Sequence, residues 1–254
     1  MMRTLSLIGI GTGNPEHMTV QGINALNRAD VILIPRKGEA KEDLADLRRV
    51  ICERFLENRQ TRIVEFDLPV RDAANPSYRR GVDDWHMAIA RAYGDLLAAH
   101  TGETGRAAFL VWGDPSLYDS TLRIIEHMRR EAGLDVALEV VPGITSIQAL
   151  AASHHMPINT IGGSILITTG RRLKAEGFPP NADTLLVMLD GDCAFQMLDG
   201  DAYEIYWGAY LGTPDELLIA GPLGDVAGQI VEARVRARED KGWIMDTYLL
   251  RVRR

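Results

Sequence analysis

Short apolar runs alternate with amphipathic stretches through the first half of the chain, a pattern typical of a parallel sheet wrapped by helices. Apolar runs predict strands at residues 5–10, 31–34, 62–66, 107–112 and 136–141. Helices are predicted between them at 20–29, 42–57, 78–99 and 120–131, the first capped by Thr19. In the second of these, Leu44, Leu47, Ile51 and Phe55 recur near helical spacing and form one apolar face.

The pattern changes after a predicted helix at 146–153. Pro157 and the pair Gly162-Gly163 indicate an interdomain connection. Beyond it, strands are predicted at 165–168, 184–189, 204–206, 216–220 and 244–250, with a helix at 226–238. A turn at Pro214-Asp215 would let neighbouring strands pair as a hairpin. The sequence therefore predicts two α/β domains with a ligand cleft between them: residues 1–157 with a parallel sheet and 158–254 with a mixed sheet.

Composition narrows the classes of function. The formal net charge of −7 argues against a nucleic-acid binder, since such domains usually carry a basic surface. No apolar run approaches the roughly 20 residues that span a bilayer, and the run at 5–10 is interpreted as a buried strand, not a signal peptide. We expect Cys52 and Cys193 to be free thiols in a cytoplasmic protein. Cys and His spacing indicates no zinc site, and no metal is expected.

The turn after the first predicted strand reads Gly9-Ile10-Gly11-Thr12-Gly13-Asn14. The dinucleotide-binding pattern requires a third glycine where Asn14 stands, and an acidic residue where the second strand ends in Pro35-Arg36. Arg36 could meet an NADP phosphate, so an NADP-linked reductase stays open as an alternative. No Gly-Lys-Ser/Thr follows, which excludes the phosphate-binding loop of the NTPases. A plain glycine-rich turn is the simplest interpretation of this segment alone.

Two further glycine loops follow predicted parallel strands. They are residues 112–118, Trp-Gly-Asp-Pro-Ser-Leu-Tyr, and residues 141–146, Val-Pro-Gly-Ile-Thr-Ser. Ligands of open α/β sheets lie at the carboxyl ends of the strands, and glycine allows a close approach of backbone to ligand. We therefore expect the three loops to converge on one edge of the sheet and form a binding site.

Taken in order, these segments resemble the tetrapyrrole methylase family. The resemblance rests on Gly9 to Pro15, Met18-Thr19, Ala29-Asp30-Val31, Gly113 to Tyr118, Pro142 to Ser146, residues 184–189 and residues 210–216. Asn14 and Thr12 depart from the Asp and Pro that are usual in the first turn, and both residue types suit a turn.

The resemblance implies two α/β domains and S-adenosylmethionine as co-substrate. It also implies a set of cofactor-binding residues: Thr12, Trp112, Gly113, Asp114, Leu117, Thr145, Ser146, Leu189, Tyr210 and Leu211. Core packing is an equal interpretation for Leu117, Leu189 and Leu211, and a turn or capping role is an alternative for Asp114.

Several stretches resemble the family member that methylates C-1 of precorrin-5 and releases its acetyl group as acetate. They are residues 109–121, 168–173, 207–213 and 242–251. The tetrapyrrole substrate carries carboxylates that suit arginine forks, and Arg36, Arg171 and Arg172 are the candidates, with Lys37 beside them. For acetate release, the candidates are Tyr118, Asp119 and Asp190, although Asp119 also suits a helix cap.

Other interpretations stay open at this point. Within the family, the chain could be another tetrapyrrole-ring methylase or the diphthamide-pathway methylase that acts on a protein. Outside it stand the NADP-linked reductase and a non-catalytic carrier of corrinoid intermediates. Family members are commonly dimers, so a homodimer is expected, with no nucleic-acid or membrane partner.

Overall fold

The computed structural model describes residues 2–36, 42–70, 78–131 and 136–253, and the chain divides into two compact units. The first unit comprises Met1–Gly11 and Pro15–Ile144, and the second comprises Thr12–Asn14 and Thr145–Arg254. The sequence pattern predicts a boundary after residue 157, whereas this division assigns helix α5 (Ser146–Ser153) to the second unit. The physical reason is packing, because α5 contacts β8 (Tyr203–Ala209) and β10 (Asp246–Val252) of that unit.

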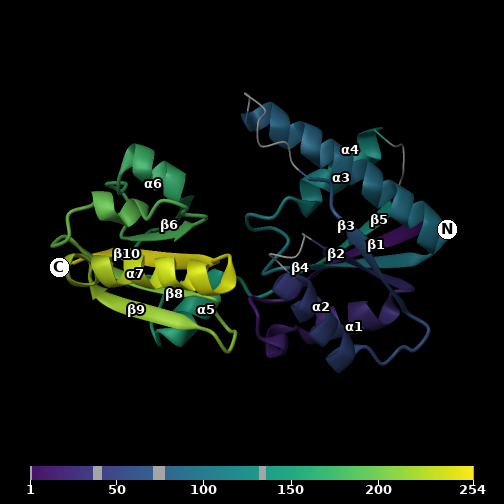
Figure 1. The fold of residues 1–254 in the computed structure, drawn as a ribbon, viewed down its shortest axis with the longest axis horizontal. Helices are drawn as coiled ribbons and strands as arrows, with labels where there is room; N and C mark the ends of the chain where they lie inside the picture. The colour runs from purple at the N-terminus through teal and green to yellow at the C-terminus, as the bar shows by residue number, and fades with distance from the viewer. Residues whose placement is uncertain (1, 37–41, 71–77, 132–135, 254) are drawn as a thin grey trace. The chain divides into compact units, whose positions relative to one another are not determined.

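The first unit is a five-stranded sheet with helices on both faces (Figure 1). All neighbouring strands are parallel, and the strand order is β3-β2-β4-β1-β5. The strands are β1 (Arg3–Gly9), β2 (Val31–Arg36), β3 (Arg62–Asp67), β4 (Arg106–Val111) and β5 (Val136–Val141). The helices are α1 (Val20–Arg28), α2 (Glu42–Phe55), α3 (Tyr78–Thr101) and α4 (Thr121–Glu131), with a short 3-10 turn η1 (Pro15–His17).

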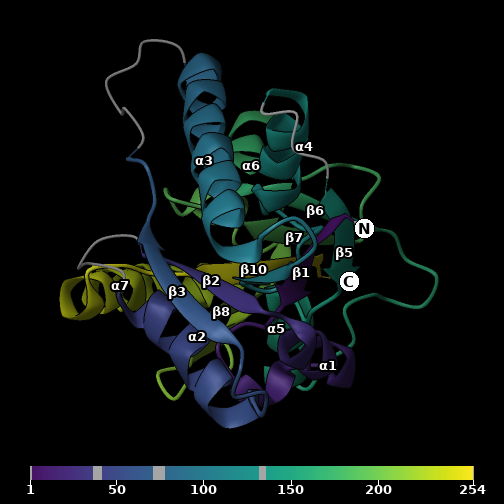
Figure 2. The same ribbon diagram turned by 90° about the vertical axis from the view of Figure 1, so that its right-hand side faces the viewer.

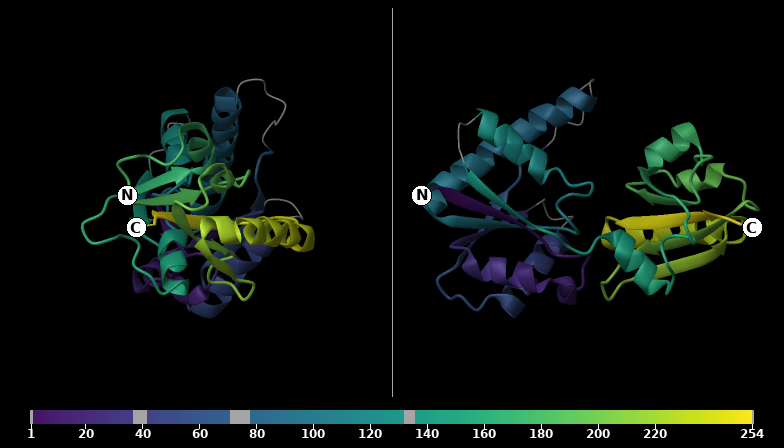
Figure 3. Two further views of the ribbon diagram at one scale, coloured as in Figure 1. Left: turned by 90° about the vertical axis from the view of Figure 1, so that its left-hand side faces the viewer. Right: turned by 180° about the vertical axis from the view of Figure 1, so that it is seen from behind.

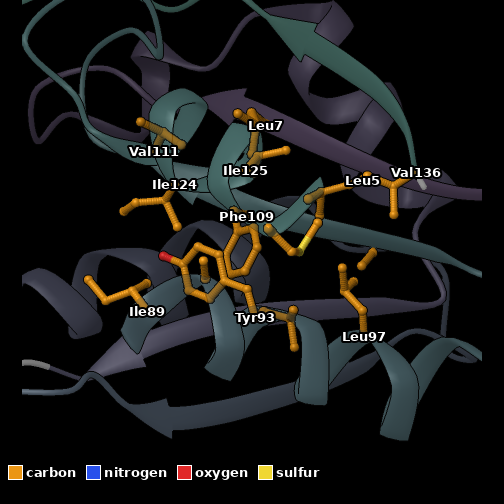
Figure 4. Close-up of a cluster of buried hydrophobic side chains, with 14 of the residues drawn as sticks. Leu5, Leu7, Ile89, Tyr93, Leu97, Phe109, Val111, Ile124, Ile125 and Val136 are labelled. Atoms are coloured by element: carbon orange, nitrogen blue, oxygen red, sulfur yellow. The ribbon is translucent and has the colours of Figure 1, made fainter. Parts of the chain in front are cut away.

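The helices cover the two faces of this sheet in pairs. Figure 2 shows α3 and α4 on one face and α1 and α2 on the other. One hydrophobic cluster lies between the sheet and α3 and α4, and another lies between the sheet and α1 and α2. Successive residues of β1 and β2 alternate between them, so Leu5 and Leu7 belong to the first cluster and Ile8 to the second. Figure 4 shows the first cluster, where the rings of Tyr93 and Phe109 lie 4.3 Å apart between centroids. Burial on both faces explains why the strands appear in the sequence as continuous apolar runs.

The second unit is a mixed sheet with strand order β6-β7-β10-β8-β9. Its other strands are β6 (Ile165–Thr169), β7 (Thr184–Met188) and β9 (Leu217–Pro222). In this sheet β6 and β7 pair in parallel, the other neighbouring strands pair antiparallel, and β8 and β9 form the predicted hairpin. Figure 3 shows the second unit from two further sides. Helices α6 (Gly170–Glu176), η3 (Ala194–Met197) and α7 (Leu223–Lys241) bury their apolar residues in one cluster with Trp207 and Tyr248 of the sheet.

The predicted fold class, a parallel-sheet α/β domain followed by a mixed-sheet α/β domain, is confirmed. The cap of the first helix is also confirmed, because the Thr19 side chain accepts a hydrogen bond from Gly22 N at 2.9 Å. Both cysteines are free, as expected. Within the described ranges, no helix is both long and apolar enough to cross a membrane.

Candidate functional site

Three glycines bring the loops after β1, β4 and β5 into backbone contact in the first unit. A β-carbon on Gly9 would lie 2.6 Å from Gly143 N and 2.8 Å from the Gly113 carbonyl oxygen. A β-carbon on Gly143 would collide with the same carbonyl oxygen. The strand order places β1 between β4 and β5, so their carboxyl ends meet at one edge. These contacts confirm the prediction that the three loops converge there.

Hydrogen bonds close this glycine cluster, by which we mean Gly9, Gly113 and Gly143. Gly113 N donates to Gly11 O at 2.7 Å, and Gly143 N donates to Asp114 Oδ2 at 2.8 Å. The other Asp114 oxygen accepts from the backbone N–H and the hydroxyl of Ser116. Burial raises the pKa of the Asp114 carboxyl, but these hydrogen bonds outweigh it, so the pKa lies below its ordinary value. Asp114 is thus a carboxylate that ties the β4 loop to the β5 loop.

The rest of the β4 loop presents its side chains differently. Trp112 and Leu117 are half-buried, whereas Tyr118 is 41% exposed. Tyr118 has φ of 50°, a left-handed conformation that is uncommon for a residue with a side chain. Asp119 Oδ1 accepts a hydrogen bond from Thr121 N at 2.7 Å at the start of α4. Asp119 lies one residue before the cap position Ser120 and satisfies the first free N–H of the helix, while its second carboxylate oxygen takes no part in this hydrogen bond.

A buried arginine lies at the same edge of the sheet. The paired register of β2 and β4 ends at Leu33. The next β2 residue placed to donate to β4 is Pro35, which has no backbone N–H, so the ladder leaves the Leu110 carbonyl without a donor from β2. Arg48 Nε of α2 instead donates to Leu110 O of β4 at 2.8 Å. Burial lowers the pKa of the Arg48 guanidinium, opposed by its electrostatic interactions with Tyr93 and Asp119.

Helix α5 begins with the predicted residues Thr145 and Ser146. The Thr145 side chain accepts from Ile147 N at 3.2 Å, and Gln148 Oε1 accepts from Thr145 N at 3.1 Å, which completes a capping box. The Ser146 hydroxyl oxygen is buried and has no hydrogen-bond partner within the described part of the chain. An unsatisfied buried hydroxyl is costly, and a polar group of a ligand is one way to satisfy it.

Two turns of the second unit hold non-glycine residues in the left-handed region. Leu189 follows β7 with φ of 54°, and Tyr210 follows β8 with φ of 50°. Leu189 is 66% exposed, which removes core packing as the explanation for this residue, whereas Tyr210 and Leu211 are each 4% exposed. The Tyr210 hydroxyl donates to Trp243 O at 2.5 Å. Strained turns of this kind are concentrated at ligand-binding sites.

The tip of the first glycine loop packs on the second of these turns. Thr12 is buried, and a β-carbon on Gly13 would collide with the Thr213 methyl group. Thr213 N donates to Tyr210 O at 3.0 Å. For this reason residues 12–14 belong to the second unit although the rest of the loop belongs to the first.

Asp190 is buried and extensively hydrogen-bonded. Its Oδ1 accepts from Asp192 N at 3.0 Å. Its Oδ2 accepts from Ala194 N and from the Tyr248 hydroxyl, each at 2.7 Å. A β-carbon on Gly170 would collide with this side chain, so α6 begins directly against it.

The three candidate substrate-binding arginines are exposed. Arg36 forms an ion pair with Asp67 at 3.0 Å, and Arg172 forms one with Glu176 at 3.0 Å. Arg171 and Arg172 occupy the first turn of α6, immediately after Gly170. Lys37 lies outside the described residues.

A model of the family Tetrapyrrole (Corrin/Porphyrin) Methylases matches residues 4–227. The chain belongs to this family. It is 55% identical over 250 residues to "Precorrin-6A synthase [deacetylating]" of Sinorhizobium sp, covering 98% of this chain and 95% of that protein.

Two solved structures share the fold. The cobalamin synthesis related protein CobF from Corynebacterium diphtheriae is 40% identical, with a TM-score of 0.83 and coverage of 99% of each chain. A uroporphyrin-III C-methyl transferase from Thermus thermophilus, solved with S-adenyl homocysteine, has a TM-score of 0.57 at 19% identity, covering 97% of this chain and 96% of that chain. The latter likeness concerns the fold alone.

Sequence reasoning does not single out two buried arginines of this tetrapyrrole methylase. Arg48 and Arg234 are 9% and 4% exposed. The sequence does carry a signal for both residues. In each helix, the period of about 3.6 residues places the arginine on the apolar face, among residues that are buried. Arg234 stands among the buried residues of α7, Leu223, Val226, Ile230 and Ala237. A charged residue at such a position indicates a buried polar partner.

Proposed function

We propose that this protein is an S-adenosylmethionine-dependent methyltransferase of cobalamin biosynthesis that acts as a deacetylating precorrin-6A synthase. In that reaction C-1 of precorrin-5 receives a methyl group and the acetyl group leaves as acetate. The observation that carries the proposal is the glycine cluster closed by Asp114, because it packs the backbones of three loops together at the carboxyl edge of the parallel sheet, where ligands of open α/β sheets bind. The 55% identity to the Sinorhizobium enzyme supports the choice of reaction.

The residues present fit S-adenosylmethionine. The glycine cluster holds the three loops together at the edge where such a ligand would bind, and the unsatisfied Ser146 hydroxyl offers a donor or acceptor for its polar groups. The exposed Leu189 offers an apolar surface of the kind that an adenine ring covers. The residues proposed to hold the ligand are Thr12, Trp112, Gly113, Asp114, Leu117, Thr145, Ser146, Leu189, Tyr210 and Leu211.

When bound, S-adenosylmethionine supplies a methyl group already activated by its sulfonium. The protein then has to bind, orient and shield the nucleophilic ring carbon from water, and proton transfer contributes little to this step. Arg171 and Arg172 are proposed to bind carboxylates of the tetrapyrrole, with Arg36 as a third contact. All three side chains are exposed and lie at element ends, so a substrate carboxylate would add to or replace the exposed ion pairs of Arg36 with Asp67 and of Arg172 with Glu176.

Acetate release requires water to add to the acetyl carbonyl. The carbon–carbon bond to the ring then breaks and its electron pair stays on the ring carbon, which takes up one proton of the water. The acetyl group leaves as acetate with the oxygen of water, and the second proton is released. Such a step benefits from a base for water and a donor for the oxyanion. The Asp119 carboxylate and the exposed Tyr118 hydroxyl are proposed for these roles. Asp190 is a weaker candidate, because it already accepts three hydrogen bonds.

Calorimetry tests the cofactor assignment. We expect S-adenosylhomocysteine to bind at micromolar or lower concentration and NADPH not to bind. Tight NADPH binding without S-adenosylhomocysteine binding would favour the NADP-linked reductase and overturn the proposal.

Product analysis tests the acetate assignment. Acetate and methylated product are measured for Tyr118→Phe, Asp119→Asn and Asp190→Asn, with the wild-type ratio as reference. We expect Tyr118→Phe and Asp119→Asn to accumulate methylated product that still carries its acetyl group, and Asp190→Asn to keep the ratio. Equal ratios in all variants would remove these residues from the step.

The expected setting is a cytoplasmic homodimer that uses no metal, with no nucleic-acid or membrane partner. The two free cysteines support a reducing compartment. Turnover that survives treatment with chelators, and a dimeric mass by light scattering, are the results that this part of the proposal predicts.

A further inference from the structure

Two turns of the second unit have strained backbone conformations that neighbouring residues must stabilise. Leu189 and Tyr210 both adopt left-handed backbone conformations, which cost free energy in residues that carry a β-carbon. Such a conformation persists only where its surroundings impose it. Both turns follow strands that run in the same direction, since β7 and β8 are each antiparallel to β10. The turns therefore lie at the same edge of the second sheet.

Arg234 of α7 contacts the first turn. Its Nη2 donates to Asp190 O at 2.5 Å, directly after Leu189, and its Nη1 contacts Cys193 Sγ at 2.8 Å. The same guanidinium pairs with Asp246 at the start of β10, Nε to Oδ2 at 3.2 Å and Nη2 to Oδ1 at 3.4 Å. Arg234 thus joins the end of β7 to the beginning of β10.

Asp246 continues the connection to the second turn. Its Oδ2 also accepts from Trp207 Nε1 of β8 at 2.8 Å. The residue before it, Met245, accepts a hydrogen bond through its carbonyl oxygen from Tyr210 N at 3.0 Å. One pair of charged side chains therefore anchors the backbone on both sides, next to Leu189 and next to Tyr210.

The burial of this pair argues for a role beyond stability. The Arg234 and Asp246 side chains are 4% and 6% exposed. Removing two charges from water costs about as much as their attraction returns, and well-packed apolar residues often serve stability as well or better. The geometric result of the pair is specific, because the planar guanidinium fixes a carbonyl, a thiol and a carboxylate at once. A Lys or an apolar residue would not fix all three.

We propose that Arg234 and Asp246 are positioning residues that hold the Leu189 and Tyr210 turns in the conformation that binds S-adenosylmethionine. The inference rests on the proposed function, because it assigns both turns to the cofactor. Tyr248 has a supporting role, since its hydroxyl donates to Asp190 beside Leu189. None of the three residues needs to touch the cofactor.

The test measures binding of S-adenosylhomocysteine by calorimetry and the kinetic constants of Arg234→Lys, Asp246→Asn and Tyr248→Phe. For the first two variants we expect affinity to fall at least about tenfold, or roughly 1.4 kcal/mol. The KM for S-adenosylmethionine should rise in parallel, while kcat at saturation and the KM for the tetrapyrrole stay within about twofold of wild type, because chemistry and substrate contacts are unchanged. Tyr248→Phe removes only a hydroxyl and keeps the shape of the core, so it still tests the inference if the other two variants unfold. Its affinity for S-adenosylhomocysteine should fall about threefold.

Matched controls come from the same sheet. Arg251→Lys alters an arginine that donates to Pro157 O and Ile158 O, and Tyr206→Phe removes a hydroxyl that donates to Glu204. Neither residue bonds to either turn in these interactions, so both variants should bind S-adenosylhomocysteine as the wild type does, whatever they lose in melting temperature. The inference is overturned if Arg234→Lys, Asp246→Asn and Tyr248→Phe bind it at wild-type strength. A wild-type protein that does not bind it would overturn the proposed function, and the inference with it.

Discussion

Adding one methyl group at Gly9 should separate the loops that form the glycine cluster. In Gly9→Ala the new β-carbon would lie 2.6 Å from Gly143 N, 2.7 Å from Gly143 Cα and 2.8 Å from Gly113 O. Ordinary contact begins near 3.4 Å, so the neighbouring backbone has to move by up to about 0.8 Å. These three nearest atoms all belong to the backbone, so the closest contacts cannot be relieved by a flexible side chain.

We expect Gly9→Ala to lose about 1–3 kcal/mol of unfolding free energy, the usual cost of overpacking a dense site. For a chain of this size that corresponds to roughly 2–4 °C in Tm for each kcal/mol. Displacing the loops also weakens the bonds from Gly113 N to Gly11 O and from Gly143 N to Asp114. Affinity for S-adenosylhomocysteine should therefore fall by about tenfold or more, measured by calorimetry beside the melting curve.

Gly102→Ala is the matched control for this prediction. Gly102 has φ of 56° and no neighbour within 4 Å of its would-be β-carbon, so the substitution introduces backbone strain without a clash. It should cost about 1–2 kcal/mol of stability and leave the affinity unchanged. A Gly9→Ala protein that binds S-adenosylhomocysteine as tightly as Gly102→Ala would refute the assignment of the glycine cluster to the cofactor.

Three further predictions concern single groups. The pKa of Asp114 is lowered in the folded protein, so the carboxylate contributes its full stabilisation above the ordinary aspartate pKa and loses it as pH falls through the lowered value. In Asp114→Asn, the free energy of unfolding measured with urea should therefore fall less steeply at acid pH than in the wild type. Burial raises the pKa of the Cys52 thiol to about 12, so Ellman's reagent at pH 8 should modify it only after unfolding. Arg171→Ala or Arg172→Ala should raise the KM for the tetrapyrrole roughly tenfold without changing S-adenosylhomocysteine affinity, since one charge-assisted contact is worth about 1.5–3 kcal/mol; unchanged KM in both would make them surface residues.

Much of the fold could be predicted because local pattern and tertiary environment agree. Strands buried on both faces appear as unbroken apolar runs, and α5 begins at the predicted Ser146 because Thr145 caps it. The convergence of the three glycine loops could also be predicted, since carboxyl ends of neighbouring parallel strands share an edge. The boundary between the units differs because α5 packs on β8 and β10, a contact that no local pattern reveals.

The site could be predicted only in part. Motifs identify Gly113, Asp114 and Ser146, yet they do not indicate that Leu189 and Tyr210 are left-handed, because that conformation is imposed by distant residues. The partners of Arg234 lie 12, 41 and 44 residues away along the chain, in β10 and in the segment after β7. Long-range polar contacts of this kind follow from tertiary packing and have no spacing rule in the sequence.

The stoichiometry of one reaction tests the central claim most directly. Precorrin-5 and S-adenosylmethionine are incubated with the wild-type protein, and the tetrapyrrole product, S-adenosylhomocysteine and acetate are quantified by mass spectrometry. The account predicts the three products in a ratio of about one to one to one, with a methyl group gained and the acetyl group lost from the ring, because one site carries out both steps. A tetrapyrrole that gains the methyl group and retains its acetyl group, with no acetate released, would contradict it.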